Sequence, residues 1–248
     1  MITTIILSSH QPFKLDLLLR SIDVFWPTHP MLYCIVDFNS TVNEGKSYHL
    51  IEERRLMECV TLSYRPPSIK DEILSIMDTT QFDYVMFLED TEVFIKPFNA
   101  DCCNALNHKE VLTFSNRIGR DHELYPCNSP IKIPPYHLYD WNNCMDSEYS
   151  KQAYSMNGNI YRASDIREWL SNTNDDDVEL ALVRGRSDRP YVACDNQSCI
   201  ASHYDRFDSE QNKLFQQNKQ VDISPFLFFD TQKYDVSYEI PLTLEWRS

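Results

Sequence analysis

The chain of 248 residues is long enough to bury the core of one large α/β domain or of two small ones. Its net charge of −14 argues against a nucleic-acid-binding surface, which needs clustered Lys and Arg, and its 4 glycines nearly exclude a glycine-rich phosphate loop. No apolar run approaches the roughly 20 residues that a transmembrane helix requires.

The N-terminus lacks the basic segment and the cleavage site of a signal peptide. The 8 cysteines form neither a C-x-x-C pair nor a His/Cys group at zinc spacing. We therefore expect mostly free thiols in a soluble protein of a reducing, cytoplasmic compartment.

Strands alternate with helices in the first part of the chain. In chain order, the patterns predict a strand over Thr3–Ser8, a helix over Phe13–Trp26, a strand over Leu32–Val36, a helix over Tyr48–Met57, a strand over Val60–Tyr64, a helix capped by Ser68 and a strand over Phe82–Leu88. This alternation predicts the α/β class, with a mostly parallel sheet flanked by helices and with ligands at the carboxyl ends of the strands.

The periodicity weakens after Phe98, and residues 120–150 are expected to form a long excursion over one face of the sheet. Regular elements are predicted again further on: a strand over Asn159–Arg162, a short helix capped by Ser164, a helix over Asp176–Val183, a strand region over Val192–Ser202 and a polar helix over Asp208–Gln220.

Acidic residues follow the most apolar of the predicted strands. Asp90 and Glu92 are two apart in an extended segment, so their side chains point to the same side and can share a Mg²⁺ or Mn²⁺ ion. A strand that ends in solvated acids explains the same pattern.

Three further positions have a functional and a structural interpretation each. Asp37, at the end of the second strand, can bind a nucleotide base or ribose, or form a turn. Asp176 and Asp177, in the first turn of a helix, can supply a general base for a sugar hydroxyl, or can cap that helix. His203, after an apolar run, can bind a metal or serve only a structural role.

In this order, the features resemble those of the GT-A glycosyltransferases, especially the inverting, family-2-like enzymes. The similarity extends from Ile2 to His203 and includes a Gly-x-x-x-Arg strand, Gly158 to Arg162. It implies a single GT-A, Rossmann-like domain over 1–248. Residues 1–100 would form a nucleotide-binding half, 101–205 an acceptor and catalytic half, and 206–248 a C-terminal helix and packing tail.

The resemblance also implies roles for individual residues. Donor binding falls to the Ser8-Ser9-His10 loop, Asp37, Glu89 and Asp90; metal binding falls to Asp90, Glu92 and His203; and the catalytic base falls to Asp177, with Asp176 beside it. The implied partners are a nucleotide-diphosphate sugar donor, a carbohydrate acceptor and Mn²⁺ or Mg²⁺. Thr91 departs from the family pattern, because it stands where the second acid of the D-x-D motif is expected.

Two other function classes stay open. Ser40 to Ser47 nearly matches a P-loop, with Gly45 and Lys46 in place but with Ser40 instead of the first glycine, so a phosphotransferase is one alternative. A non-catalytic carbohydrate-binding protein on the same fold is the other, because Thr91 weakens the metal motif. A nucleotidyltransferase is disfavoured, since no glycine-rich, basic N-terminal loop is present.

Overall fold

The structure is a computed structural model. It describes residues 1–9, 12–29, 31–37, 42–54, 60–117, 133–141, 154–174, 177–184, 189–195, 199–202, 217, 220–221 and 246–247. None of the described helices combines the length and the apolar character that are needed to span a bilayer.

The first part of the chain alternates between strand and helix, as its sequence predicts. The elements are β1 (Ile2–Ser9), α1 (Pro12–Phe25), β2 (Leu32–Asp37), α2 (Val42–Arg54), β3 (Val60–Tyr64), α3 (Ile69–Thr80) and β4 (Tyr84–Glu89). The predicted cap of α3 is confirmed, because Ser68 Oγ accepts a hydrogen bond of 3.1 Å from the Asp71 amide. Gln81 ends this helix in the left-handed region, at φ 48°.

The second part is more irregular. Its elements are β5 (Glu92–Phe94), the 3₁₀ helix η1 (Ala100–Asn107), β6 (Val111–Ser115), β7 (His137–Asp140), β8 (Asn159–Arg162), α5 (Ala163–Ser171), α6 (Val178–Arg184), β9 (Tyr191–Cys194), β10 (Ile200–Ser202), β11 (Gln220–Val221) and β12 (Trp246–Arg247).

Eight strands form one mixed sheet in the order β3-β2-β1-β4-β8-β6-β9-β7. β1 to β4 are parallel to one another, and β6 and β9 run in the same direction, whereas β8 and β7 are antiparallel to their neighbours. The predicted α/β class with a mostly parallel sheet is therefore confirmed. A second, small sheet pairs β5 with β10 in antiparallel fashion.

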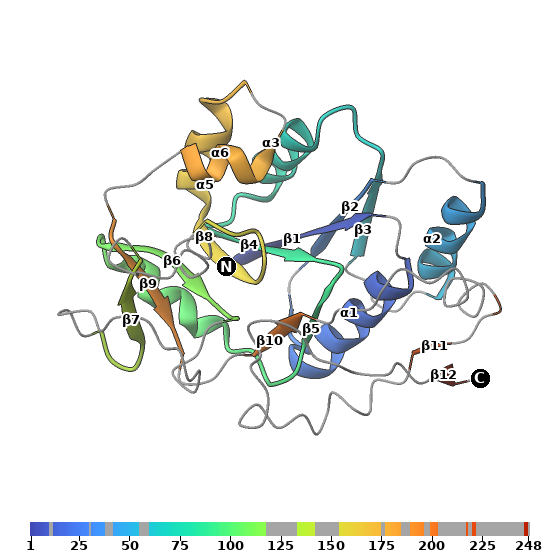
Figure 1. The fold of residues 1–248 in the computed structure, drawn as a ribbon, viewed down its shortest axis with the longest axis horizontal. Coiled ribbons are helices and arrows are strands. Elements are labelled where there is room, and N and C mark those ends of the chain that lie inside the picture. The colour runs from blue at the N-terminus through green and yellow to red at the C-terminus, as the bar shows by residue number, and fades with distance from the viewer. Residues whose placement is uncertain are drawn as a thin grey trace.

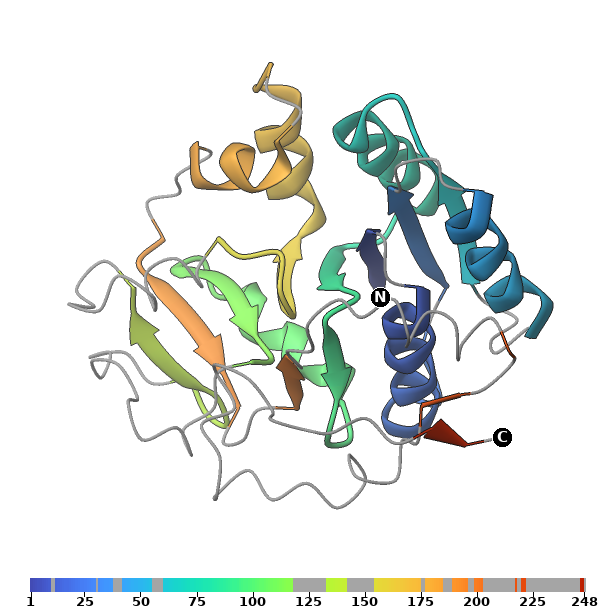
Figure 2. The same ribbon diagram turned by 45° about the vertical axis from the view of Figure 1, so that its right-hand side comes forward.

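Helices cover both faces of the large sheet. α3, α5 and α6 lie over one face, and α1 lies over the opposite face (Figures 1 and 2). β4 shows why its sequence is a continuous apolar run: Val85 and Phe87 belong to the core on one side, and Met86 and Leu88 to the core on the other.

Several details differ from the sequence-based expectations. The predicted strand region Val192–Ser202 is divided between β9 and β10, which lie in different sheets. β7 shows that part of the expected excursion over 120–150 joins the large sheet as its last strand. Arg162, rather than Ser164, occupies the N-cap position of α5 and makes no side-chain capping bond.

Other expectations concern the helix α2, the thiols and the C-terminal region. α2 begins at Val42, so Val42 to Gly45 are helical and cannot wrap a phosphate as a P-loop does, which removes the basis of the phosphotransferase alternative. The five described cysteines are free thiols, as expected: Cys34, Cys102, Cys103, Cys194 and Cys199. Most of the predicted helix Asp208–Gln220 lies outside the described residues, and Gln220 begins β11.

Candidate functional site

Several of the predicted donor-binding positions meet at the carboxyl edge of the parallel strands. Strand register places Ser9 opposite Asp37, and Leu7 opposite Glu89. The ends of β1, β2 and β4 therefore form one continuous edge, where the ligands of open α/β sheets bind. His10 and the side chain of Asp37 lie outside the described residues.

Asp90 joins the ends of β1 and β4. Its side chain is buried, and Oδ2 accepts hydrogen bonds from Ser8 Oγ at 2.7 Å and from the Ser9 amide at 3.0 Å. Its own amide donates to the Leu7 carbonyl at 3.0 Å, and Ser8 Oγ also lies 2.9 Å from the Tyr48 hydroxyl. Asp90 thereby fixes the Ser8-Ser9 segment that was predicted to contact the nucleotide.

Glu92 is completely buried behind this edge. Its Oε2 accepts a hydrogen bond of 2.9 Å from the Glu89 amide, and its Oε1 lies 4.0 Å from Arg117 Nε. Burial raises the pKa of Glu92 to about 8, although the Arg117 guanidinium acts in the opposite direction. The Glu92 carboxyl group thus supports the backbone of Glu89 from the protein interior.

Gly158 closes the space around the pair formed by Glu92 and Arg117. Its φ is +66°, and a Cβ at this position would lie 3.0 Å from Arg117 Cγ, 3.2 Å from Glu92 Oε1 and 3.4 Å from Ile200 Cδ1. Both the left-handed backbone and the close contacts therefore require glycine here.

Glu89, the last residue of β4, interacts with several polar groups at this edge of the sheet, which we call the acidic edge. With the amide of Asn157 oriented so that its nitrogen faces the carboxylate, Asn157 donates to the two oxygens of Glu89 at 2.8 and 3.2 Å. The pKa of Glu89 is raised to about 7 by burial and by the negative charges of Glu179 and Asp90, while Arg117 and a hydrogen bond from Thr91 oppose this shift. Thr91, the departure from the D-x-D pattern, thus stabilises the charge of the neighbouring acid.

The start of α6 brings a second group of acids close to this edge. Buried Val178, Ala181 and Leu182 anchor the helix, and Glu179 lies exposed in its first turn. Asp177 Oδ1 accepts a hydrogen bond of 3.0 Å from the Leu180 amide, so Asp177 caps the helix as the structural interpretation predicts. Asp177 is itself exposed and lies one residue before α6, while Asp176 lies outside the described residues.

The negative charge of Glu179 acts on Glu89, so the first turn of α6 lies within electrostatic reach of the acids near position 90. Sequence reasoning gave no role to Asn157 or Arg117, because both act across the fold on residues distant in the chain. Glu179, in contrast, lies within the Asp176-Asp177-Val-Glu-Leu element.

Among the described residues, no three His, Cys, Asp or Glu side chains are grouped to hold a metal ion, and His203 lies outside them. The assignment of a metal to Asp90, Glu92 and His203 stays a prediction.

Neither a protein-family model nor a curated protein matches the sequence. The fold is similar to that of S. aureus TarS, with a TM-score of 0.49 and 9% identity, over 88% of this chain and 42% of that one.

Two structures of TarS residues 1–349 also match. One has a TM-score of 0.48 and 10% identity, over 80% of this chain and 58% of that chain. The other, a complex with UDP, has a TM-score of 0.46 and 13% identity, over 78% of this chain and 60% of that chain. This chain therefore spans between 42% and 60% of the TarS chains that it matches, and the likeness concerns the course of the backbone.

Proposed function

We propose that this protein is a glycosyltransferase that moves a sugar from a nucleotide-diphosphate donor to a hydroxyl group of a carbohydrate acceptor, with inversion at the anomeric carbon. One observation carries the proposal: Glu89, at the carboxyl edge of the parallel strands and in line with the end of β2, lies within electrostatic reach of Asp90 and of Glu179 in the first turn of α6. Such an edge is where an α/β sheet binds a nucleotide.

The donor would lie along the ends of β1 and β2. The Ser8-Ser9-His10 segment and Asp37 would contact the nucleotide, and Glu89 and Asp90 would lie on the diphosphate side. Support comes from the bonds that Asp90 makes to Ser8 and Ser9, because they hold this segment in one conformation before a ligand arrives. A segment that is already ordered loses less conformational entropy on binding, which increases the affinity for the ligand.

A divalent cation such as Mn²⁺ or Mg²⁺ is part of the proposal. Glu89, Asp90 and Glu179 repel a diphosphate, so the donor needs a positive charge beside it. Burial is the main cause of the raised pKa of Glu89, and the negative charges of Glu179 and Asp90 raise it further. Mg²⁺ in nucleotide sites is commonly bound by one or two carboxylates together with substrate phosphates, which fits an edge that presents Glu89. When bound, the ion would neutralise charge that develops on the leaving diphosphate.

The acid at the start of α6 would take the proton of the acceptor hydroxyl. We assign this role to Asp177, with Asp176 beside it, because its exposed side chain is fixed at the end of an anchored helix. As the bond from the anomeric carbon to the diphosphate breaks, the acceptor oxygen forms the new bond from the opposite face. Its proton passes to the carboxylate, which gives inversion.

Donor hydrolysis without an acceptor tests the proposal. UDP-, GDP- and dTDP-sugars would be incubated with the full chain, with and without Mn²⁺, and release of the nucleoside diphosphate would be measured. We expect release from one of these donors, and a large loss of it in Glu89→Gln but not in Glu53→Gln, an exposed acid on α2. Equal release by both variants would refute the assignment of the site.

A non-catalytic carbohydrate-binding protein on the same fold is the second candidate. Two features favour it. Thr91 makes a hydrogen bond to Glu89 where the enzyme family has a metal ligand, and Asp177 caps α6 where the enzyme needs a general base. If this protein binds glycans but releases no nucleotide from any of these donors, that result would support the second candidate.

A further inference from the structure

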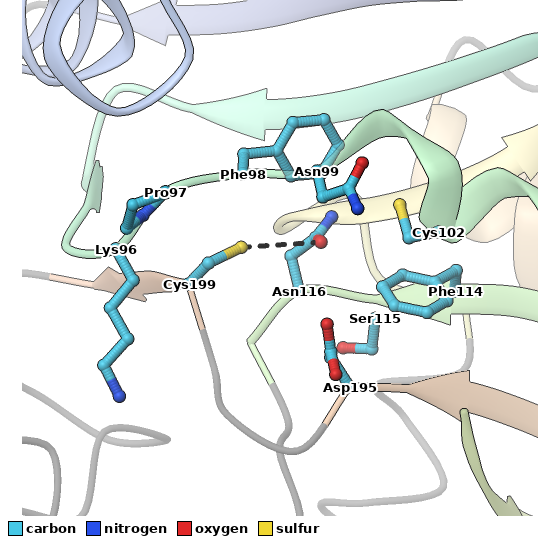
Figure 3. Close-up of a pocket in the computed structure, with 10 residues that line it drawn as sticks. All are labelled: Lys96, Pro97, Phe98, Asn99, Cys102, Phe114, Ser115, Asn116, Asp195 and Cys199. Atoms are coloured by element: carbon cyan, nitrogen blue, oxygen red, sulfur yellow. Dashed lines mark hydrogen bonds between the residues drawn. The ribbon is translucent and has the colours of Figure 1, made fainter. Parts of the chain in front are cut away.

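A cavity of about 310 Å³ lies between the ends of β5, β6 and β9 and the start of η1 (Figure 3). Its volume is at the small end of the ~300–1,000 Å³ that is usual for small-molecule sites. The apolar part of its lining consists of Phe98, Phe114 and Cys102, and polar groups come from Ser115, Asn116 and Asp195.

Ser115 is the observation that points to a ligand. Its side chain is only 1% exposed, and its hydroxyl has no hydrogen-bond partner among the described residues. Buried hydroxyl groups are nearly always hydrogen-bonded, because leaving one unpaired costs free energy. The hydroxyl oxygen itself is buried, so the Ser115 side chain would have to rotate about χ1 to meet a ligand hydroxyl in the cavity, which would then supply the missing partner.

Asn116 presents its amide in a fixed orientation beside Ser115. Its Nδ2 donates to the Gly158 carbonyl at 2.9 Å, and its Oδ1 accepts a hydrogen bond of 3.5 Å from Cys199 Sγ (Figure 3). Burial raises the pKa of Cys199 to about 12, so this thiol stays protonated and serves as a donor rather than as a nucleophile.

We propose that this cavity binds one saccharide ring of the acceptor, an inference that rests on the proposed glycosyltransferase function. A sugar ring combines hydroxyl groups at its rim with apolar C–H faces, and the cavity combines a hydroxyl, an amide and a carboxylate with two phenyl rings. An anionic ligand fits less well, because the Asp195 carboxylate lies near Ser115 while the Lys96 side chain extends away from both (Figure 3).

The position of the cavity in the sheet agrees with this role. Met86 of β4, Ile160 of β8 and Phe114 of β6 are in register, so β4 and β6 lie about 10 Å apart at the usual spacing of strands. Asn116 also bonds to Gly158, the neighbour of Asn157, which bonds to Glu89. An acceptor of a few linked rings is long enough to contact both the cavity and the acidic edge.

Direct binding of saccharides, measured without a donor, tests the cavity independently of transfer. Glucose, galactose, N-acetylglucosamine and their disaccharides would be titrated into the full chain by calorimetry or ligand-observed NMR. We expect at least one to bind, and Ser115→Ala and Asp195→Asn each to weaken its binding about tenfold. Ser63→Ala, on β3 at the other end of the sheet, is the control and should leave Kd unchanged.

Two results would overturn the proposal: no saccharide binds to the wild-type protein, or both variants bind as well as the control. Ser115→Ala is nearly isosteric and Asp195 is exposed, so both variants should fold. Donor hydrolysis is measured in parallel. Hydrolysis without saccharide binding would refute only the proposed saccharide site. Saccharide binding without hydrolysis would refute the proposed transferase function and would leave the saccharide site standing.

Discussion

Gly158→Ala is the substitution whose effect the structure defines most closely. The alanine would have to adopt φ +66°, which costs an L-residue about 1–2 kcal/mol. Its Cβ would also meet Arg117 Cγ at 3.0 Å and Glu92 Oε1 at 3.2 Å, and such overpacking costs about 1–3 kcal/mol. We therefore expect the free energy of unfolding to fall by roughly 2–5 kcal/mol.

Urea denaturation followed by circular dichroism would measure this loss as a lower midpoint at an unchanged slope. Gly45→Ala is the control, because Gly45 lies within α2, where the same change is expected to stabilise by about 0.5–1 kcal/mol. A loss below about 1 kcal/mol for Gly158→Ala would show that the backbone and the Glu92 pair adapt easily, and would refute the reasoning.

Three further predictions concern the acids. Asp177→Asn should lower turnover by ~10²–10⁴ while the Kd of the donor stays the same, and full activity in that variant would exclude Asp177 as the base. Glu179→Gln removes a negative charge that raises the pKa of Glu89, so carboxyl-resolved NMR titration should find that pKa lower than about 7; an unchanged value would mean that the two groups do not interact. Glu92 has a folded pKa of about 8, above its ordinary 4.5, so ionisation of this group destabilises the fold as the pH rises between these values. Urea midpoints of Glu92→Gln should consequently fall less over this range than those of the wild type, and parallel curves would contradict the assignment.

The sequence predicts the first part of the fold well because local and tertiary preferences agree there. β4 is apolar throughout because both of its faces are buried, and α3 has a serine cap, acids in its first turn and a regular apolar face. The second part depends on pairing between distant segments. β5 and β10 are three residues long and pair with each other, and no local pattern specifies such a contact.

The candidate site was predictable to the same extent. The positions of Ser9, Asp37 and Glu89 follow from the rule that parallel strands end at one edge, and the strand register agrees with it. The contribution of Asn157 and the burial of Glu92 were not predictable, because each depends on how β8 and β5 pack behind that edge. A polar residue after a strand has the same sequence signature whether its side chain faces a ligand or the core.

The direction of β8 links the candidate site to the order of folding. Because β8 is antiparallel to β4, its first residues, and not its last, reach the carboxyl edge, and they come from late in the chain. The ribosome releases β1 to β4 well before Asn157 and Gly158, so a chain that has formed only those four strands holds Glu89 without the groups that complete its surroundings. Non-local pairing of this kind is slow to form. The site is therefore a property of the completely folded chain, and a nascent chain that has formed only its N-terminal strands lacks it.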